Sequence, residues 1–245
     1  MESGAALNLL PDEDGFYDIG ELYKAVPKTN RIIFVIRHSE RNSSLGQESP
    51  LTENGKEKAL DLGKKLLAEE PFYYASTDFV RTRETCRLIA EGRGEENFDV
   101  DIWQGVDGDY FLRVSDDSLS RFASNRGGAW KIISRWAYAD STMSENLASN
   151  VNALFYDLFE RGKQFVEGAV AQGLKKNRVS VMVSHDVLLE PLTVYATNRS
   201  IDLRFYKSGR WIAYLAGVAI VVGENSQVNL YPVRGDSVGY MTVSK

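Results

Sequence analysis

The sequence predicts an α/β fold, a three-layer sandwich in which a mostly parallel sheet lies between two layers of helices. Apolar runs with the length of buried strands alternate along the chain with segments whose apolar residues recur at helical spacing. Two of these runs end in a histidine, at His38 and at His185. Near the C-terminus, two further runs are joined by the turn-forming stretch GENSQ, which predicts a hairpin and an antiparallel edge on the sheet.

The first half of the chain supplies two predicted strands and three predicted helices. Residues 32–37 are continuously apolar up to their last residue, as expected of a strand buried on both faces, and the preceding stretch DIGELYKAV predicts a short helix. The stretch SPLTENGKEKALDLGKKLLAEE predicts a helix with Thr52 as its N-cap. FYYAST (72–77) predicts the next strand, and DFVRTRETCRLIAEG predicts a helix that ends at Gly92.

The second half begins with a long stretch that fits no regular alternation of strands and helices. Residues 98–175 are read as a largely helical insertion over one end of the sheet, within a single domain spanning 1–245. RVSVMVSH (178–185) predicts a strand, and DVLLEPLTVYATN predicts a helix kinked or begun near Pro191. WIAYLAGVAIVVG (211–223) and VNLYPV predict the two strands of the C-terminal hairpin.

Composition places the chain among ordinary globular proteins, with 43% hydrophobic and 26% charged residues. Its net charge of −5 offers no global attraction for nucleic acid or an anionic membrane. No apolar stretch reaches the roughly 18 residues of a membrane span, and the N-terminal stretch lacks a signal-peptide pattern. A cytoplasmic location is therefore the default expectation, and a periplasmic or secreted one applies if a signal peptide has been removed. Cys86 is the only cysteine, which excludes an internal disulfide and a cysteine-based metal site.

Basic residues are concentrated where the first strand ends, in RIIFVIRHSERNSS. Because the protein as a whole is acidic, this basic cluster is expected to attract an anion at one site and not to give the whole surface a positive potential. Ligands of open α/β sheets lie beyond the carboxyl ends of the strands, and both His38 and His185 are predicted at such ends. The sequence therefore predicts one site that contains both histidines.

Four segments, taken in order, resemble the histidine phosphatase superfamily, which includes phosphoglycerate-mutase-like and acid-phosphatase-like enzymes. They are RHSERNSS, the helix start SPLTENG, the stretch YASTDFVRTRET and the later VMVSHD. The resemblance implies a metal-independent, cofactor-free hydrolase of phosphate monoesters, a phosphatase whose partner is a small phosphorylated substrate. It also implies that reaction passes through a phosphohistidine.

The resemblance assigns roles to the first cluster and to the second helix. His38 is the expected nucleophile, which must be neutral to attack phosphorus. Arg37 and Arg81 match the arginines that hold the phosphoryl group, since a guanidinium binds phosphate through two N–H groups. Arg41 corresponds to a third arginine of the acid-phosphatase branch. Ser39 stands where the family usually has glycine, a residue with more backbone freedom.

The resemblance assigns the remaining catalytic roles to the end of the later strand. His185 is expected to donate a hydrogen bond to a phosphoryl oxygen. Asp186 is the expected general acid, which would need a raised pKa, and it can also cap a helix that starts at Val187. In other branches of the superfamily the acid comes from the segment after the second helix, where Asp107 and Asp109 are the candidates.

Two alternatives stay open beside the hydrolase. One is a phosphomutase of the same superfamily, and the other is a non-catalytic module that binds a phosphorylated ligand. The sequence leaves open the natural substrate and the oligomeric state. Among the tryptophans, which are expected to be mainly core residues, Trp130 and Trp136 of the insertion are candidates for lining a substrate cleft.

Overall fold

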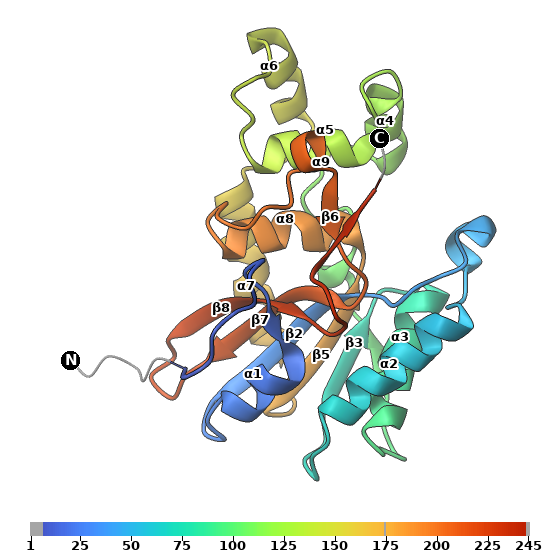
Figure 1. Cartoon of the computed structure of the whole chain (residues 1–245), viewed down its shortest axis with the longest axis vertical. Coiled ribbons are helices and arrows are strands. Elements are labelled where there is room, and N and C mark those ends of the chain that lie inside the picture. Colours follow the sequence, from blue (N-terminus) through green and yellow to red (C-terminus); the bar gives the residue numbers. More distant parts are fainter. Residues whose placement is uncertain (1–6, 174, 244–245) are drawn as a thin grey trace.

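Seven strands form the central sheet of the computed structural model, which describes residues 7–173 and 175–243 (Figure 1). In spatial order the strands are β1 (Tyr17–Asp18), β8 (Val228–Arg234), β7 (Ala216–Val222), β2 (Arg31–Arg37), β5 (Val179–Ser184), β3 (Tyr73–Ser76) and β4 (Val100–Ile102). Among the described strands of this sheet, only β7 runs antiparallel to its neighbours, β2 and β8. The predicted mostly parallel sheet with an α/β fold is confirmed.

The C-terminal hairpin forms as predicted, although its place in the sheet differs from the expected edge. The backbone N–H of Gly223 donates to the carbonyl of Gln227 at 2.9 Å and closes the turn between β7 and β8. β7 lies beside the central strand β2, so the antiparallel strand is internal to the sheet. β8 and the short β1 lie outside it.

The single strand predicted over 211–223 is wrong, because the chain turns at its middle. Leu215 has a φ of 57°, and its backbone N–H donates to the carbonyl of Arg37 at 3.1 Å. The part before this turn forms β6 (Arg210–Ile212), which pairs with β9 (Tyr240–Thr242) in a separate two-stranded sheet. The turn therefore directs residues 213–215 toward the end of β2.

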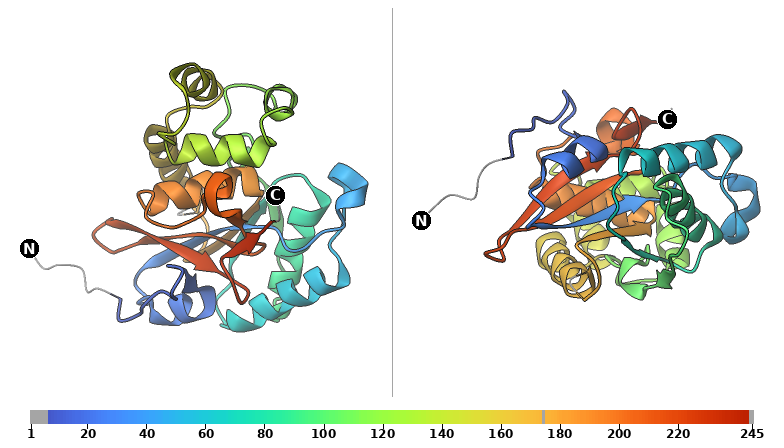
Figure 2. Two further views of the ribbon diagram at one scale, coloured as in Figure 1. Left: turned by 45° about the horizontal axis from the view of Figure 1, so that its top comes forward. Right: turned by 90° about the horizontal axis from the view of Figure 1, so that it is seen from below.

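Helices cover both faces of the sheet, as predicted. On one face lie α1 (Ile19–Ala25), α2 (Glu53–Lys65) and α3 (Val80–Gly92), which Figure 2 shows together on one side of the strands. On the other face lie α7 (Leu158–Gly173) and α8 (Asp186–Ala196). Side chains of β2 alternate between the two apolar cores: Ile32, Phe34 and Ile36 face α1–α3, and Ile33 and Val35 face α7 and α8.

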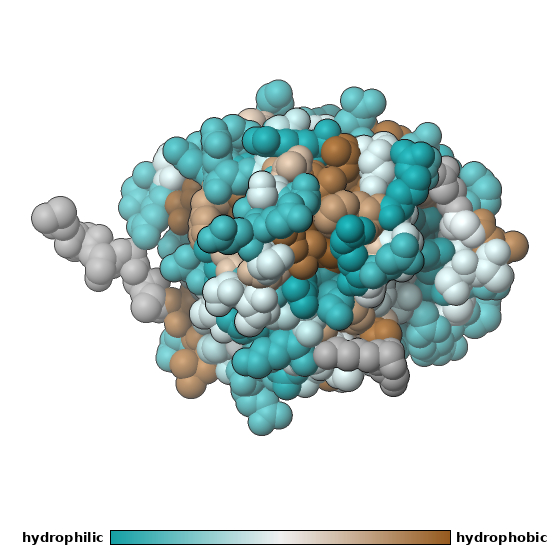
Figure 3. Space-filling view, turned by 90° about the horizontal axis from the view of Figure 1, so that it is seen from above, coloured by the Kyte–Doolittle hydropathy of each residue, from teal (hydrophilic) through white to brown (hydrophobic). Residues whose placement is uncertain are grey.

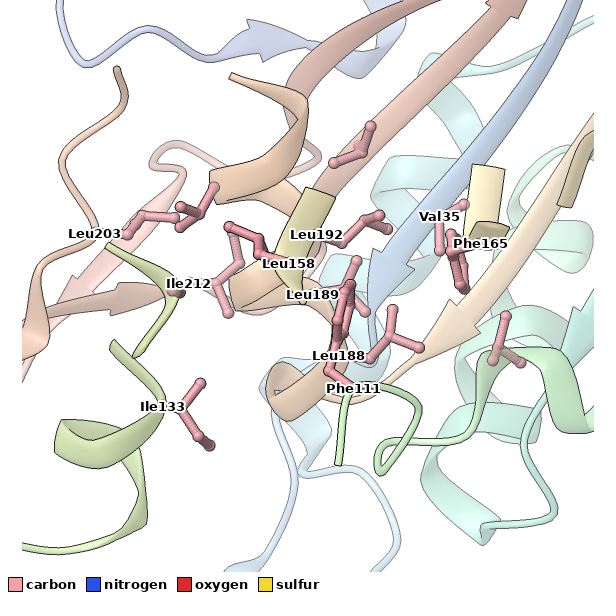
Figure 4. Packing of buried hydrophobic residues seen from close by; sticks show 14 of the residues in the cluster. Val35, Phe111, Ile133, Leu158, Phe165, Leu188, Leu189, Leu192, Leu203 and Ile212 are labelled. Carbon is pink, nitrogen blue, oxygen red and sulfur yellow. The ribbon is translucent and has the colours of Figure 1, made fainter. Parts of the chain in front are cut away.

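The core beside α8 continues into the more distant helices. Figure 4 shows labelled residues of this core, among them Val35, Phe165 and Leu189. Ile133 of α5 (Ala129–Ala137) and Leu203 belong to the same core. α5 packs against α8 and against the short α9 (Phe205–Ser208), so the outer helices are attached through apolar contacts.

Helix ends agree with the sequence at α2 and α3 and differ at α8. Thr52 caps α2 by accepting a hydrogen bond from the N–H of Gly55 at 3.0 Å, and α3 ends at Gly92. α8 is one helix that contains Pro191, and it starts at Asp186 with His185 as its N-cap. Asp186 is therefore the first helical residue and not the cap of a helix that starts at Val187.

The predicted insertion, 98–175, is too wide, because both of its ends belong to the layers of the main fold. β4 pairs with β3, and α7 packs against β2, β7 and α8. The segment between them holds η2 (Gln104–Val106), α4 (Asp116–Ala123), α5 and α6 (Glu145–Ala153). Figure 1 shows α4, α5 and α6 above α8, and Figure 3, viewed from their side, shows hydrophobic residues near the middle of this face.

None of the helices within 7–173 and 175–243 combines the length and the apolarity that a membrane crossing requires. Residues 1–6, which begin the stretch inspected for a signal peptide, lie outside the described part of the chain.

Candidate active site

A cavity of about 770 Å³ opens at the carboxyl ends of β2 and β5, where the sequence predicts a site. Its lining includes all eight residues considered from the sequence, namely Arg37, His38, Arg41, Arg81, Asp107, Asp109, His185 and Asp186. The other lining residues are Ser43 and Gly46 of η1 (Ser43–Glu48), Phe79, Gly108, Asp116, Trp130, Val187 and Tyr214. Five separate regions of the chain thus contribute charged groups to one cavity.

His38 is held directly after β2 with one ring nitrogen committed to the backbone. Its N–H donates to the carbonyl of Ser184 at 2.9 Å, and Nδ1 lies 2.7 Å from the carbonyl oxygen of Ser39. Because a carbonyl only accepts, Nδ1 carries the proton and Nε2 keeps a lone pair. Nε2 accepts a hydrogen bond from Nε of Arg81 at 3.2 Å.

The surroundings of His38 keep its imidazole neutral. Burial of the ring, which is 2% exposed, lowers the pKa of His38 well below 6.5. The positive charge of Arg37 and the neighbouring His185 lower this pKa further, and Arg81 adds a smaller contribution in the same direction. The residue expected to be a nucleophile is therefore in the protonation state that nucleophilic attack requires.

His185 lies beside His38, with ring centroids 5.6 Å apart. Nδ1 of His185 is 3.2 Å from Nη2 of Arg81, which can only donate, so the ring proton is on Nε2. Nε2–H donates to Oγ1 of Thr77 at 2.9 Å, and Thr77 lies 2.9 Å from Oγ1 of Thr82. The N–H of the neutral ring is already used, so the expected donation to a phosphoryl oxygen requires a proton on Nδ1.

Burial is also the main cause of the low pKa of His185, which is about 3. The positive charges of Arg81, Arg37 and Arg41 lower this pKa as well, and the carboxylate of Asp186 partly offsets them. The protein groups around His185 therefore keep it neutral, and a bound anion would favour its protonation.

Arg37 is anchored on three sides. Nη1 donates to the carbonyl of Ile212 at 2.7 Å, Nη2 lies 3.5 Å from Oδ2 of Asp186, and the guanidinium stacks at 4.2 Å from the ring centroid of Tyr214. Its Nε is buried and has no hydrogen-bond partner in the described part of the chain. These contacts hold the guanidinium of Arg37, and therefore its positive charge, in one place in the cavity.

The other two arginines reach the cavity from a helix and from a loop. Arg81 lies in the first turn of α3, and its guanidinium is 4.4 Å from the ring centroid of Phe79. Burial and the charges of Arg41 and Arg37 lower the pKa of Arg81 to about 10, so it stays protonated at neutral pH. Arg41 is partly exposed, and its Nη1 donates to Oγ of Ser49 at 3.1 Å.

Ser39 fits its position without the backbone freedom of glycine, because it is not among the described residues with a positive φ. Its N–H donates to Oγ1 of Thr85 at 3.0 Å, and its hydroxyl donates to the carbonyl of Gly55 at 2.7 Å. These bonds tie the segment after β2 to α2 and α3, so Ser39 connects the two helices to His38.

Asp186 has the opposite electrostatic environment from the one expected of a general acid. Burial alone would raise its pKa, but the charge of Arg37 and a 2.8 Å hydrogen bond from Nε1 of Trp211 more than offset this. The pKa of Asp186 is therefore lowered, and its carboxylate is stabilised in the ionised form. The protein groups around Asp186 therefore do not supply the raised pKa that a general acid needs.

Three carboxyl groups lie on the cavity wall contributed by η2 and α4. Burial and the charge of Asp109 raise the pKa of Asp107. Burial, Asp109 and Asp117 together raise the pKa of Asp116. No group of three or more His, Cys, Asp or Glu side chains within the described ranges is placed to hold a metal ion.

The sequence did not indicate two residues of the site: Tyr214, which lines the cavity, and Thr77, which contacts His185 from behind it. Tyr214 lies in the turn between β6 and β7, which the sequence pattern presented as one strand, so no local signal marked it. Thr77 directly follows β3, and the rule that singled out the histidines at strand ends could have found it. Trp130, a candidate from the sequence, does line the cavity, whereas Trp136 is buried and stacks on Phe155 with ring centroids 4.3 Å apart.

Comparisons with known proteins agree with this architecture. The sequence model of the histidine phosphatase superfamily, branch 1, matches residues 33–228. A comparison with curated protein sequences finds no match. Branch 1 is the phosphoglycerate-mutase-like branch, although two of the motifs, at Arg41 and Asp186, resemble the acid-phosphatase branch.

Solved structures with low sequence identity share the fold. A phosphoglycerate mutase from Bacillus anthracis has a TM-score of 0.53 at 17% identity, covering 85% of this chain and 94% of that one. Bacillus stearothermophilus YhfR has a TM-score of 0.52 at 18% identity, covering 84% and 98%. A mycobacterial glucosyl-3-phosphoglycerate phosphatase has a TM-score of 0.51 at 14% identity, covering 85% and 100%. At these identities the likeness concerns the fold alone.

Proposed function

Because this chain belongs to branch 1 of the histidine phosphatase superfamily, whose members bind small phosphorylated substrates, we propose that it hydrolyses phosphate monoesters through a phosphohistidine at His38. The observation that carries the proposal is the lone pair on Nε2 of His38. It belongs to a neutral imidazole fixed by the Ser39 carbonyl, within a cavity that also contains three arginines.

In the first step Nε2 of His38 attacks phosphorus, a P–N bond forms, and the bond between phosphorus and the ester oxygen breaks. The charge on the three other phosphoryl oxygens is balanced by Arg37, Arg41 and Arg81, since phosphoryl transfer depends mainly on positioning and electrostatic stabilisation. Loss of the ester oxygen as an alkoxide is unfavourable, so a general acid protonates it as it leaves.

We assign this acid to Asp107. Its raised pKa favours the protonated form, whereas the lowered pKa of Asp186 does not. Asp186 instead fixes Arg37 and accepts from Trp211. Its role is therefore to position the phosphate-binding group.

In the second step the Asp107 carboxylate takes a proton from a water molecule as that water attacks the phosphorus of the phosphohistidine. The P–N bond breaks, inorganic phosphate forms, and His38 returns to its neutral form with Nε2 unprotonated. The same carboxyl group thus acts as acid and then as base, which restores the starting state.

The proposal is tested by phosphate release from 4-nitrophenyl phosphate in the presence of EDTA. We expect turnover that chelation does not reduce and that His38→Ala lowers at least about a thousandfold, because both steps pass through Nε2. Retention of the wild-type melting temperature in His38→Ala separates loss of the nucleophile from loss of the fold.

Two results would contradict the proposal. A His38→Ala variant with full activity would leave the imidazole without a chemical role, and binding of phosphate with no turnover in the wild type would indicate a non-catalytic module. A mutase is distinguished by incubation with 3-phosphoglycerate and 2,3-bisphosphoglycerate. Isomerisation without net phosphate release would replace the hydrolase by a mutase.

A further inference from the structure

The cavity has two charged sides of opposite sign. Arg37, Arg41 and Arg81 surround the histidines, whereas Asp107, Asp109 and Asp116 come from the segment of η2 and α4. The phosphoryl group of a substrate occupies the basic side. The acidic side consequently faces the alcohol portion of the substrate, which makes it a determinant of specificity.

The three carboxyl groups are not satisfied by neighbouring side chains. None of them forms an ion pair or a side-chain hydrogen bond with another residue in 7–173 or 175–243. Burial is the main cause of the raised pKa values of Asp107 and Asp116; the charge of Asp109 adds to both shifts, and that of Asp117 adds to the shift of Asp116. With Asp107 acting as the general acid, Asp109 and Asp116 remain as two carboxyl groups without an ion-pair partner among the described residues, beside an incoming phosphate.

Two structural explanations for these charges are insufficient. A resident metal held by three or more protein side chains does not account for them, because no such group of His, Cys, Asp or Glu exists in the described ranges. Acidic residues also stabilise the first turn of a helix, which accounts for an acid at the start of α4. Asp117 serves that role equally from the same turn and does not line the cavity, so helix stability does not explain why Asp116 faces it.

An aromatic side chain that lines the same cavity also favours a ligand with a positive charge. Phe79 and Tyr214 are already covered by the guanidinium groups of Arg81 and Arg37, at 4.4 and 4.2 Å from the ring centroids. Trp130 is partly exposed and lines the cavity; one face of its ring stacks on Trp211 with centroids 4.9 Å apart, and no cation of the described residues lies over the ring. An indole is the aromatic group that attracts a cation most strongly.

We propose that the substrate is a phosphate ester whose alcohol portion carries an ammonium group, bound by Asp109 and Asp116 beside Trp130. The inference rests on the proposed hydrolase activity and adds the substrate class to it. An ammonium group would offset the repulsion between these carboxylates and the phosphate. A carboxylate at the same place, as in a phosphoglycerate, would increase that repulsion.

The experiment compares kcat/KM for esters matched in shape and different in charge. Phosphocholine is paired with its neutral isostere 3,3-dimethylbutyl phosphate, 2-aminoethyl phosphate with propyl phosphate, and 2-carboxyethyl phosphate serves as the anionic member. We expect each ammonium ester to be preferred over its neutral partner by at least about tenfold, the order expected of one charge-assisted contact. The anionic ester is expected to be the poorest substrate.

Variants assign the preference to the proposed residues. Asp109→Asn and Asp116→Asn are expected to reduce the ratio of ammonium to neutral ester toward one, mainly through KM. Asp117→Asn removes a charge from the same helical turn outside the cavity and is expected to leave the ratio unchanged. Trp130→Leu is expected to reduce the phosphocholine preference more than the 2-aminoethyl phosphate preference.

The outcomes separate this inference from the proposed function. Hydrolysis of the neutral or anionic esters at least as fast as the ammonium esters overturns the substrate class and leaves the hydrolase intact. An ammonium preference that Asp109→Asn and Asp116→Asn do not change overturns the assignment to these residues. Absence of turnover for every ester, 4-nitrophenyl phosphate included, overturns the hydrolase and this inference with it.

Discussion

The Ser39 carbonyl, 2.7 Å from Nδ1 of His38, determines which imidazole nitrogen stays unprotonated, namely the Nε2 that accepts from Nε of Arg81. A comparable restriction acts on His185, whose Nε2–H is directed to Thr77. Two histidines with the same intrinsic chemistry thus acquire different roles from their second ring nitrogen. Nε2 of His38 can attack once Nε of Arg81 donates to the phosphoryl group instead, and Nδ1 of His185 can accept a proton when an anion binds.

The pKa of Asp107 is raised and that of Asp186 is lowered, which makes Asp107 the expected general acid. Loss of Asp107 should therefore affect turnover most for esters with a poor leaving group. Asp107→Asn is expected to lower kcat for an alkyl phosphate about a hundredfold and to have a much smaller effect on 4-nitrophenyl phosphate, whose leaving group needs no proton. Asp186→Asn weakens the positioning of Arg37 and is expected to lower turnover of both esters by similar factors. Steady-state assays with the two esters measure this, and a leaving-group dependence confined to Asp186→Asn would return the acid role to that residue.

The same assignment sets the sign of the pH dependence. A general acid acts while protonated, so kcat for an alkyl phosphate falls as the pH rises through the raised pKa of Asp107. On the acidic side His38 stays neutral to well below pH 6.5, because burial and Arg37 disfavour its protonation. We therefore expect an acid-shifted optimum for kcat, and a kcat profile that rises through pH 6.5 toward alkaline pH would contradict it.

At the scale of the elements, the site depends on a close contact between α2 and the segment after β2. A Cβ placed on Gly55 would collide with the backbone of Glu40, two residues after His38. Gly55→Ala is expected to lower kcat/KM at least about tenfold by displacing this segment, because small misplacements of catalytic groups are costly. Gly168→Ala, on the exposed side of α7 with open space around it, is the control and is expected to leave activity unchanged.

Activity assays and a phosphate-bound crystal structure of Gly55→Ala measure the effect. If Gly55→Ala has unchanged kinetics and the segment after β2 keeps its original position, α2 does not position His38. A slight gain in stability is expected for Gly168→Ala, since alanine favours helix more than glycine does.

Elements with a local signature could be predicted from the sequence. The apolar run of β2, the Thr52 cap of α2 and the turn between β7 and β8 each depend on neighbouring residues, and they form as expected. The break between β6 and β7 depends on a hydrogen bond from Leu215 to Arg37, a contact between residues remote in sequence. No pattern within the stretch 211–223 could have indicated it.

The candidate site shows the same division. The residues at strand ends were found because the carboxyl ends of parallel strands share one edge of the sheet. The contacts of Asp186 with Arg37 and Trp211 could not be predicted, because these residues come from strands remote in sequence. Tyr214 and Asp116 reach the cavity through tertiary packing that a single sequence does not encode visibly.

For the whole molecule, burial of the two neutral histidines links stability to pH. The pKa of His185 is about 3 in the folded state and near 6.5 when unfolded, so below pH 6.5 the unfolded chain binds a proton that the native state does not. Stability is therefore full above pH 6.5 and falls as the pH decreases toward 3. The loss is up to about 1.4 kcal/mol per pH unit for each such histidine.

Urea unfolding between pH 7.5 and pH 5.0 measures this dependence. His185→Gln is the informative variant, because glutamine offers one donor and one acceptor side to Thr77 and Arg81 but does not titrate. Its free energy of unfolding is expected to vary less with pH than that of the wild type. An identical pH dependence in the two proteins would mean that His185 is not held neutral by the fold.

The central claim, covalent catalysis by His38, is tested most directly by trapping the intermediate. The protein is mixed with 4-nitrophenyl phosphate, quenched rapidly in alkaline denaturant that preserves phosphohistidine, and digested for mass spectrometry. We expect one phosphoryl group on the peptide that contains His38, attached at Nε2, and none in His38→Ala. Turnover by the wild type with the phosphoryl group on another residue, or with none on the protein while His38→Ala stays active, would contradict the claim.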